Sequence, residues 1–320
     1  MPEFRTATVV ITTRNRRDDL SKAIVSALAQ SVRPEILVMD DGSTDDTASA
    51  VAREFPSVRL QRSERSLGYI AQRNRAAQLA SNPIIFSMDD DAVFSTPTIV
   101  ETTLREFDHP RVGAVAIPFI DVQRSPAVHQ RAPSPHGIFA AYSFIGTAHA
   151  LRRDVFLALG GYREILVHQG EEEDYCLRLL NAGWITRCGC ADPILHFESP
   201  RRSLARMDYY GARNKVLYAW HNVPYPQVAP HLAGTTAKTL AYSLQPARWW
   251  TRLRGVWAAY LLCAGGRVRR QPVPKSVYRL SQELKRNPAM PLEPITFRLP
   301  RSLSQPAPAP VTAIASSTSA

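Results

Sequence analysis

The stretch Pro83-Ile84-Ile85-Phe86-Ser87-Met88-Asp89-Asp90-Asp91 places an apolar run directly before three consecutive carboxylates. An apolar run of this length predicts a buried strand. Adjacent carboxylates repel one another, and a cation coordinated by their oxygens is the simplest way to keep them ionised together. Mg²⁺ or Mn²⁺ held in this way usually completes its coordination with substrate phosphates. The triplet therefore indicates an enzyme that acts on a phosphorylated ligand, with a solvated acidic loop as the alternative.

Strand and helix signals alternate on both sides of this run. Strands are predicted over 7–13, 35–39, 58–61, 83–88 and 112–118, and helices over 18–30, 43–55, 68–80 and 98–107. This order predicts an α/β fold with a mostly parallel central sheet flanked by helices. Ligands bind such sheets at the carboxyl ends of the strands, so Asp40 and Asp41, after strand 35–39, should meet the triplet. Residues 121–136 are predicted to form a loop of a length that often serves as a lid.

Charge is distributed unevenly along the 320 residues, whose net charge is +11. Residues 1–200 contain 21 Lys and Arg against 25 Asp and Glu, a net −4, and residues 201–320 contain 18 against 3, a net +15. The acidic chemistry thus belongs to the first part of the chain. The basic last part predicts a negatively charged partner, either a membrane surface or nucleic acid.

The four cysteines are few and irregularly spaced, which predicts no disulfide framework and fits a reducing cytosol. Cys188, Cys190 and His196 match no common zinc pattern, because a fourth ligand is missing. Neither a signal peptide nor an apolar stretch long enough to span a bilayer is expected. The predicted location is therefore cytoplasmic.

Three further segments hold candidate site residues. Asp41 precedes Gly42 at a predicted strand end, where a carboxylate can accept from a base imide or a ribose hydroxyl, with helix capping as the alternative. Arg73 lies one helical turn after Gly68, within reach of phosphate or of the acidic pair, unless the helix is simply a basic surface helix. His196 stands between apolar residues, a context more typical of a structural histidine than of a ligand.

A run of four acids, Glu171-Glu172-Glu173-Asp174, leads into another predicted helix. The dipole at a helix N-terminus favours anions, which explains one or two acids here but not four. A carboxylate at this position can deprotonate a hydroxyl nucleophile that lies within its reach.

Taken in order, seven segments resemble the family-2 glycosyltransferases of the GT-A (nucleotide-diphospho-sugar transferase) fold. The resemblance covers roughly residues 5–220 and rests on VVITTRNR (9–16), VMDDGSTDDT (38–47), LGYIAQRNRA (67–76), FSMDDDAVF (86–94), GTAHALRRDVFLALGGYRE (146–164), GEEEDYCLRLLNAGW (170–184) and ILHF (194–197). Each motif alone is weak to moderate, and their shared order makes the resemblance strong.

The resemblance implies roles for individual residues. Thr13, Asp41 and Arg73 are expected to bind the nucleotide of a nucleotide-sugar donor. Asp89 and Asp91 are expected to form the Asp-x-Asp pair that holds a divalent metal (Mg²⁺ or Mn²⁺) and the diphosphate. Two further expectations concern Asp90, which should point away from that pair or contact the donor sugar, and His196, which should be a third metal ligand.

The resemblance also implies an inverting transfer to a hydroxyl acceptor, a glycan or a lipid-linked sugar, with a carboxylate as catalytic base. Counting back from Arg178 aligns that base with Glu172. The family commonly has Glu-Asp at the start of this helix, whereas this chain has Glu171-Glu172, so Glu171 or Glu173 remains an alternative base. Asp174 is expected to position its neighbours.

Three parts are predicted along the chain: a GT-A catalytic domain over 1–222, a basic and mainly helical C-terminal extension over 223–300, and a disordered tail over 301–320. Helices are expected over 203–222 and 236–265. Trp249, Trp250 and Trp257 stand beside arginines, which suits peripheral binding to an anionic membrane surface, at the inner face of the plasma membrane, with a solvated packing subdomain as the alternative.

Two other functions compete with this interpretation. A sugar nucleotidyltransferase should show an early glycine-rich loop, but no glycine follows strand 7–13 in Thr12–Arg16. A nucleic-acid-binding module would use the basic last third of the chain, but it leaves the acidic segments unexplained. Nucleic acid is therefore not the expected partner.

Overall fold

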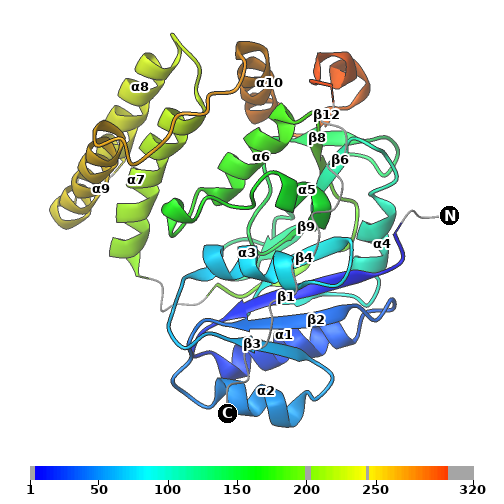
Figure 1. Ribbon diagram of the computed structural model, residues 1–320. Coiled ribbons are helices and arrows are strands. Elements are labelled where there is room, and N and C mark those ends of the chain that lie inside the picture. Colours follow the sequence, from blue (N-terminus) through cyan, green and yellow to red (C-terminus); the bar gives the residue numbers. More distant parts are fainter. Residues whose placement is uncertain (1–3, 199–202, 243–244, 302–320) are drawn as a thin grey trace, which may run out of the picture.

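A nine-stranded sheet runs through the computed structural model, which describes residues 4–198, 203–242 and 245–301 (Figure 1). The strands follow one another in the order β12-β8-β10-β6-β9-β4-β1-β2-β3. Their bounds are β1 (Ala7–Thr13), β2 (Glu35–Asp40), β3 (Arg59–Arg62), β4 (Ile84–Asp89), β6 (Val112–Ala116), β8 (Phe139–Ala141), β9 (His149–Arg152), β10 (Ile185–Cys188) and β12 (Met290–Pro291).

Seven of these nine strands point in the same direction. β1 pairs in parallel with β2 and β4, β2 with β3, and β10 with β6, while β9 is antiparallel to β4 and β6, and β8 is antiparallel to β10 and β12. The prediction of a mostly parallel α/β sheet is therefore confirmed.

Helices cover both faces of the sheet. Val9 and Ile11 of β1 share one hydrophobic core with Ile24, whereas the intervening Val10 shares another with Ile70, because successive strand residues face opposite sides. The first core is covered by α1 (Arg17–Leu28), α2 (Thr47–Glu54) and α4 (Ile99–Arg105), and the second mainly by α3 (Tyr69–Leu79), α5 (Arg153–Ala158) and α6 (Glu171–Asn181). Figure 1 shows α1 and α2 on one side of the strands and α3 on the other.

A second, three-stranded sheet positions the site. Its order is β5-β11-β7, from β5 (Ala92–Phe94), β11 (Ile194–His196) and β7 (Phe119–Asp121). β11 is antiparallel to β5, and His196 is the register partner of Ala92. Because Ala92 directly follows Asp91, this pairing carries His196 to the aspartate triplet from more than a hundred residues away in the sequence.

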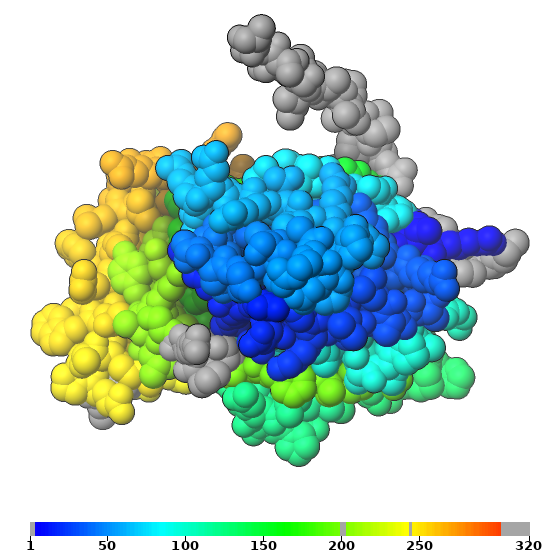
Figure 2. Space-filling model, turned by 90° about the horizontal axis from the view of Figure 1, so that it is seen from below, coloured from blue at the N-terminus to red at the C-terminus, as the bar shows by residue number. Residues whose placement is uncertain are grey.

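Three helices lie beside the sheet: α7 (Leu204–Asn222), α8 (Val228–Ala241) and α9 (Pro246–Ala264). In a view from below, yellow residues form one side of the molecule, and green residues lie between them and the blue N-terminal part (Figure 2). Asp208 of α7 accepts hydrogen bonds from Arg248 Nε at 2.7 Å and Arg252 Nε at 2.9 Å, which joins α7 to α9. Gly255 allows the close approach of these two helices, because a Cβ there would overlap the backbone oxygen of Tyr209.

The prediction of one helix over 236–265 was wrong. α8 ends at Ala241 and α9 begins with Pro246 at its first position. Proline lacks a backbone N–H and clashes with a preceding helical turn, so it starts a helix rather than continuing one. None of the helices in the described ranges combines the length and the apolar character that crossing a membrane requires.

After α9 the chain returns to the far edge of the sheet through α10 (Lys275–Arg286), β12 and the 3₁₀ helix η2 (Glu293–Arg298). Another 3₁₀ helix, η1 (Glu164–Leu166), precedes α6. The division at residues 222 and 300 stays a prediction. The tail predicted to be disordered lies outside the described residues, apart from Arg301.

Candidate active site

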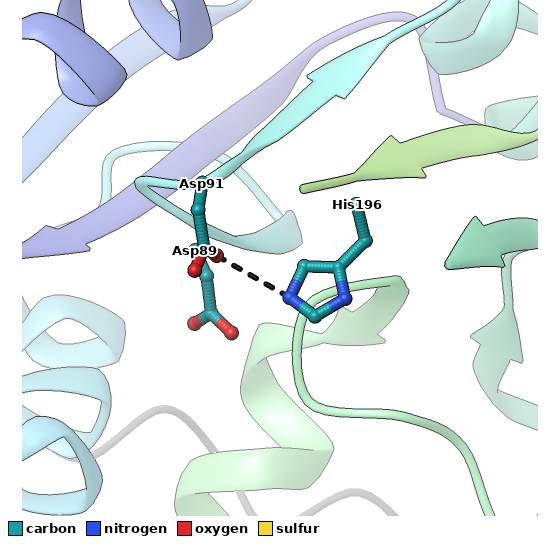
Figure 3. A group of neighbouring side chains, drawn as sticks. All are labelled: Asp89, Asp91 and His196. Atoms are coloured by element: carbon teal, nitrogen blue, oxygen red, sulfur yellow. Dashed lines mark ion pairs between the residues drawn. The ribbon is translucent and has the colours of Figure 1, made fainter. Parts of the chain in front are cut away.

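The aspartate triplet and His196 meet at the carboxyl end of β4. Ligand atoms of Asp89, Asp91 and His196 all lie within 4.8 Å of one another, and His196 Nε2 is 3.3 Å from Asp91 Oδ1 (Figure 3). Within the described ranges, no other three His, Cys, Asp or Glu side chains gather in this way, so Cys188 and Cys190 form no zinc site with His196 there.

This donor set fits a divalent cation. Carboxylate oxygens are the ligands that Mg²⁺ and Mn²⁺ prefer, and a neutral imidazole can complete a site for Mn²⁺. Nδ1 of His196 lies 3.9 Å from Asp121 Oδ2, within ion-pair distance but too far for a hydrogen bond. Burial acts to raise the pKa of Asp91, but the hydrogen bond and charge of His196, together with Arg16, lower that pKa to about 2. Asp91 is therefore a carboxylate at neutral pH.

Asp90 has different partners from its two neighbours. Its Oδ2 accepts a hydrogen bond of 2.8 Å from Thr13 Oγ1, and its Oδ1 lies 2.9 Å from Nη1 of Arg16. The same Arg16 nitrogen is 2.9 Å from Asp91 Oδ2. Burial raises the pKa of Asp90 to about 7, although the charge of Arg16 opposes that rise. The triplet thus separates into a pair beside His196 and a central member beside β1.

Arg73 is a buried cation that connects the triplet with α6. Its Nη2 donates to Asp89 Oδ1 at 2.7 Å, its Nη1 to Glu171 Oε1 at 3.3 Å, and its guanidinium lies 4.8 Å from the centre of the Tyr69 ring. Burial acts to lower the pKa of Arg73, but the charges of Asp89 and Glu171 raise it above its ordinary value. At 5% exposure, Arg73 does not belong to a basic surface helix.

Asp41 holds the loop that leads into α3. Its Oδ1 accepts from Leu67 N at 2.7 Å and Gln72 Nε2 at 2.8 Å, and its Oδ2 accepts from Ser66 Oγ at 2.5 Å and Gly68 N at 3.1 Å. Gly42 makes the close approach of this loop possible, because its φ is 74° and a Cβ would lie 2.9 Å from the carbonyl carbon of Arg65. Asp41 therefore shapes the loop at the end of β2.

The four acids at the start of α6 have separate surroundings. Glu171 is fully buried, and it accepts from Tyr69 Oη at 3.2 Å as well as from Arg73. Glu173 accepts from Tyr142 Oη at 3.0 Å and from Lys285 Nζ at 3.3 Å. Asp174 accepts from Arg163, from Arg178 Nε at 2.9 Å and from Asn222 Nδ2 at 2.8 Å.

Glu172, the second acid of the run, borders a cavity. Among the described residues, no side chain is hydrogen-bonded to it. The cavity has a volume of about 920 Å³ and lies between the start of α6, β8 and helices α7, α8 and α10. Burial raises the pKa of Glu172, with Arg73 lowering it and Glu173 and Asp89 raising it further. A Cβ on Gly146 would lie 2.9 Å from both Glu172 Oε1 and Arg73 Nη1, so the acid and the arginine face the same short loop.

Burial also raises the pKa of Glu171, to about 8, with the charge of Glu172 as the next cause. Two neighbouring carboxyls thus share one low-dielectric site at the start of the helix. Raised carboxyl pKa values beside a cavity and a metal-type cluster are typical of a catalytic acid–base site.

The sequence profile of the family described as glycosyl transferase family 2 matches residues 8–162, which include β1, Asp41, Arg73 and the aspartate triplet. This part, just under half of the chain, is similar to glycosyl transferase family 2. The prediction of that family is confirmed.

Curated proteins that the chain resembles include two bacterial ones. The succinoglycan biosynthesis protein ExoU of Rhizobium meliloti is 35% identical over 134 residues, which cover 40% of this chain and 39% of that protein. The pre-mycofactocin glycosyltransferase of Mycobacterium tuberculosis is 28% identical over 248 residues, which cover 69% of this chain and 49% of that protein. The chain thus spans less than half the length of these two relatives.

Solved structures show the same fold. The mannosyltransferase PcManGT from Pyrobaculum calidifontis, solved in complex with GDP-Man and Mn²⁺, matches with a TM-score of 0.54 at 19% identity. The match covers 87% of this chain and 84% of that one. The predicted GT-A fold is therefore confirmed.

Sequence reasoning missed Arg16 as a site residue. Arg16 bridges Asp90 and Asp91, and its position three residues after β1, at the same edge of the sheet as the triplet, was the available signal. The lysines that line the cavity carry no local signal, because they come from separate helices.

Proposed function

We propose that this protein is a metal-dependent, inverting glycosyltransferase that moves a sugar from a nucleoside-diphosphate donor to a hydroxyl of a glycan or lipid-linked acceptor. The observation that carries the proposal is the position of Glu172, which borders a large cavity and adjoins the Asp89–Asp91–His196 group through Arg73. A relative named for succinoglycan biosynthesis supports a role in the assembly of surface polysaccharide.

The donor side of the site consists of the triplet and its partners. A divalent cation held by Asp89, Asp91 and His196 would neutralise the charge that develops on the leaving diphosphate. Mn²⁺ and a nucleotide sugar are present together in the structurally similar mannosyltransferase, which supports this role.

Thr13 and Asp90, which are hydrogen-bonded to each other, are proposed to lie beside the donor at the end of β1. Asp41 and Arg73 act on the donor through the groups that they hold: Asp41 through the loop 66–68 and Arg73 through Asp89. This assignment follows from their hydrogen bonds, which already occupy both oxygens of Asp41 and both terminal nitrogens of Arg73.

The base is Glu172. A base accepts a proton more readily when its pKa is raised toward the working pH, and burial supplies that shift here. Glu172 takes the proton of an acceptor hydroxyl, whose oxygen bonds to the anomeric carbon as the bond from that carbon to the diphosphate breaks on the opposite face. Configuration therefore inverts. Glu171 and Glu173, the alternative bases, are engaged by Arg73 and Tyr69 and by Tyr142 and Lys285, respectively.

The outward face of α9 supports peripheral attachment to an anionic membrane surface. Trp250, Trp257 and Leu261 are 59%, 64% and 55% exposed, and their spacing places them on one side of the helix together with the exposed Arg254. The opposite side packs against α7 through Gly255. Aromatic and leucine side chains next to arginines suit the headgroup region of an anionic bilayer. If the protein does not float with anionic vesicles at modest salt, this part of the proposal fails.

The rival functions have lost their support. Similarity to glycosyl transferase family 2 and the separate partners of each acid favour a glycosyltransferase over a sugar nucleotidyltransferase or a nucleic-acid-binding module. A screen of nucleotide sugars for nucleoside-diphosphate release, with and without Mn²⁺, tests the function directly. Release from at least one donor that depends on the cation is expected, and no release from any donor would refute the proposal.

A further inference from the structure

Four segments that are far apart in the sequence each bring a cation to the cavity beside Glu172. The cavity of about 920 Å³ is lined by Lys215 of α7, Lys238 of α8, Lys285 of α10 and Arg131 of the loop after β7. Its acids are Glu172 and Glu173. Cations therefore outnumber acids two to one in the wall of this cavity.

Ion pairing within the cavity does not neutralise its positive charge. Lys285 Nζ lies 3.3 Å from Glu173 Oε2, so this lysine is compensated. Within the described ranges, Lys215 and Lys238 have no carboxylate at ion-pair distance. Both Lys215 and Lys238 are exposed on their helices.

The positive potential reaches the cavity wall. His231 of α8 lines the same cavity, and its Nδ1 lies 2.7 Å from Tyr278 Oη. Burial lowers the pKa of His231, and the charges of Lys285 and then of Lys238 lower it further, with Glu173 acting in the opposite direction. Two of the lysines thus act on one side chain of the wall, which places their charges around one space rather than on unrelated surfaces.

A neutral acceptor would leave Lys215 and Lys238 without a partner in the complex. An ammonium group is a compact point charge that can bind a phosphate from many directions, whereas planar carboxylates are matched best by the fork of an arginine. The lysines of this cavity therefore fit a phosphate, and Arg131 in the same wall can bind one as well.

We infer that the acceptor carries a phosphate group, which Lys215 and Lys238 contact while the reacting hydroxyl lies at Glu172. The inference rests on the proposed function, because that function makes this cavity the acceptor site. A lipid-linked diphosphate and a phosphorylated glycan share the required chemistry.

Isothermal titration calorimetry on the full chain tests the inference. The protein is kept free of metal with EDTA, because Asp89 and Asp91 then repel anions from the donor side. The ligands are inorganic pyrophosphate, which represents a lipid-linked diphosphate, glycerol 3-phosphate, which represents a phosphomonoester, and glucuronate, which represents a carboxylate.

The variants distinguish an effect of Lys215 and Lys238 on binding from an effect of the overall charge of the protein. Lys215→Ala/Lys238→Ala should weaken the binding of a phosphate ligand by at least about tenfold, given two charge-assisted contacts at partly exposed positions. Lys275→Ala removes an exposed lysine of α10 that does not line the cavity, and it should change binding by less than about twofold. Glu173→Gln should strengthen binding, because Lys285 then loses its carboxylate partner. Thermal unfolding of each variant verifies the fold.

Preference for pyrophosphate would assign the lipid-linked diphosphate, and preference for glycerol 3-phosphate would assign the phosphorylated glycan. Equal weakening in Lys275→Ala, absent binding of both phosphates, or lysine-dependent binding of glucuronate alone would overturn the inference. Donor hydrolysis by the wild-type protein without lysine-dependent phosphate binding refutes the inference and leaves the proposed function. Lysine-dependent binding without hydrolysis of any donor refutes the proposed function, and with it the assignment of the bound phosphate to an acceptor.

Discussion

The substitution Glu172→Gln should abolish most of the turnover while leaving the fold and the donor site intact. It keeps the shape of the side chain and removes its ability to take a proton. A positioned general base typically contributes about 10²–10⁴-fold, or about 3–5 kcal/mol of barrier, so the turnover number should fall by that factor.

The structure also predicts what this substitution leaves unchanged. No other described side chain bonds to Glu172, so no ion pair is lost, and a neutral amide avoids the cost of ionising a buried carboxyl. The thermal unfolding temperature should therefore be no lower than that of the wild type. Donor affinity should also persist, because Glu172 is not a member of the Asp89–Asp91–His196 group.

The assay is nucleoside-diphosphate release coupled to sugar transfer, measured at saturating donor across a range of pH. The base acts in its deprotonated form, so activity should rise with pH through a pKa that burial has raised above the ordinary glutamate range. That limb should be absent from the residual activity of Glu172→Gln. Glu173→Gln is the matched control and should reduce turnover by less than about tenfold, because Glu173 is engaged by Lys285 and Tyr142. Undiminished turnover in Glu172→Gln, with a large loss in Glu171→Gln or Glu173→Gln, would move the base to the other residue.

Three more outcomes are expected. Asp91→Asn should abolish Mn²⁺ binding measured by calorimetry, whereas Asp90→Asn should reduce it less, because Asp90 bonds to Thr13 and Arg16 instead; equal losses would contradict the separation of the triplet. Trp250→Ala/Trp257→Ala should reduce flotation with anionic vesicles severalfold. The control Val25→Ala/Leu28→Ala, at exposed residues of α1, should leave flotation unchanged. Equal effects of the two variants would show that α9 is not the attachment face. Burial raises the pKa of Glu106 to about 7 from 4.5, so the folded state holds this proton more tightly than the unfolded chain, and stability is lost as pH rises through that interval. The free energy of unfolding, measured with denaturant, should fall by up to about 3 kcal/mol over this interval. In Glu106→Gln it should depend less on pH. An unchanged pH dependence in that variant would assign the effect to another group.

The fold was largely predictable from the sequence. The apolar run 83–88 predicted β4, and the order of strands and helices predicted a mostly parallel sheet, because burial of one face imposes a period of two on a strand and 3.6 on a helix. The carboxyl ends of parallel strands lie at one edge, so the order of the elements predicted that Asp41 and the triplet share an edge of the sheet, whereas the contacts of Asp41 are with residues 66–72. The prediction of a continuous helix over 236–265 was wrong at Pro246. Proline disfavours a helix interior, so the sequence already argued against this continuation.

Tertiary structure decided the rest, because contacts between distant segments leave no local trace. The pairing of β11 with β5 delivers His196 to Asp91, and no periodicity near residue 196 announces it. Burial and partners separate Glu171, Glu172 and Glu173, which are chemically identical in the sequence. The net positive charge of the last third of the chain can be counted from the sequence. Only the packing of the helices shows that some of its arginines bind Asp208 and that some of its lysines line the cavity. Sequence patterns report which face of an element is buried, whereas the identity of the neighbours on that face depends on how the elements pack.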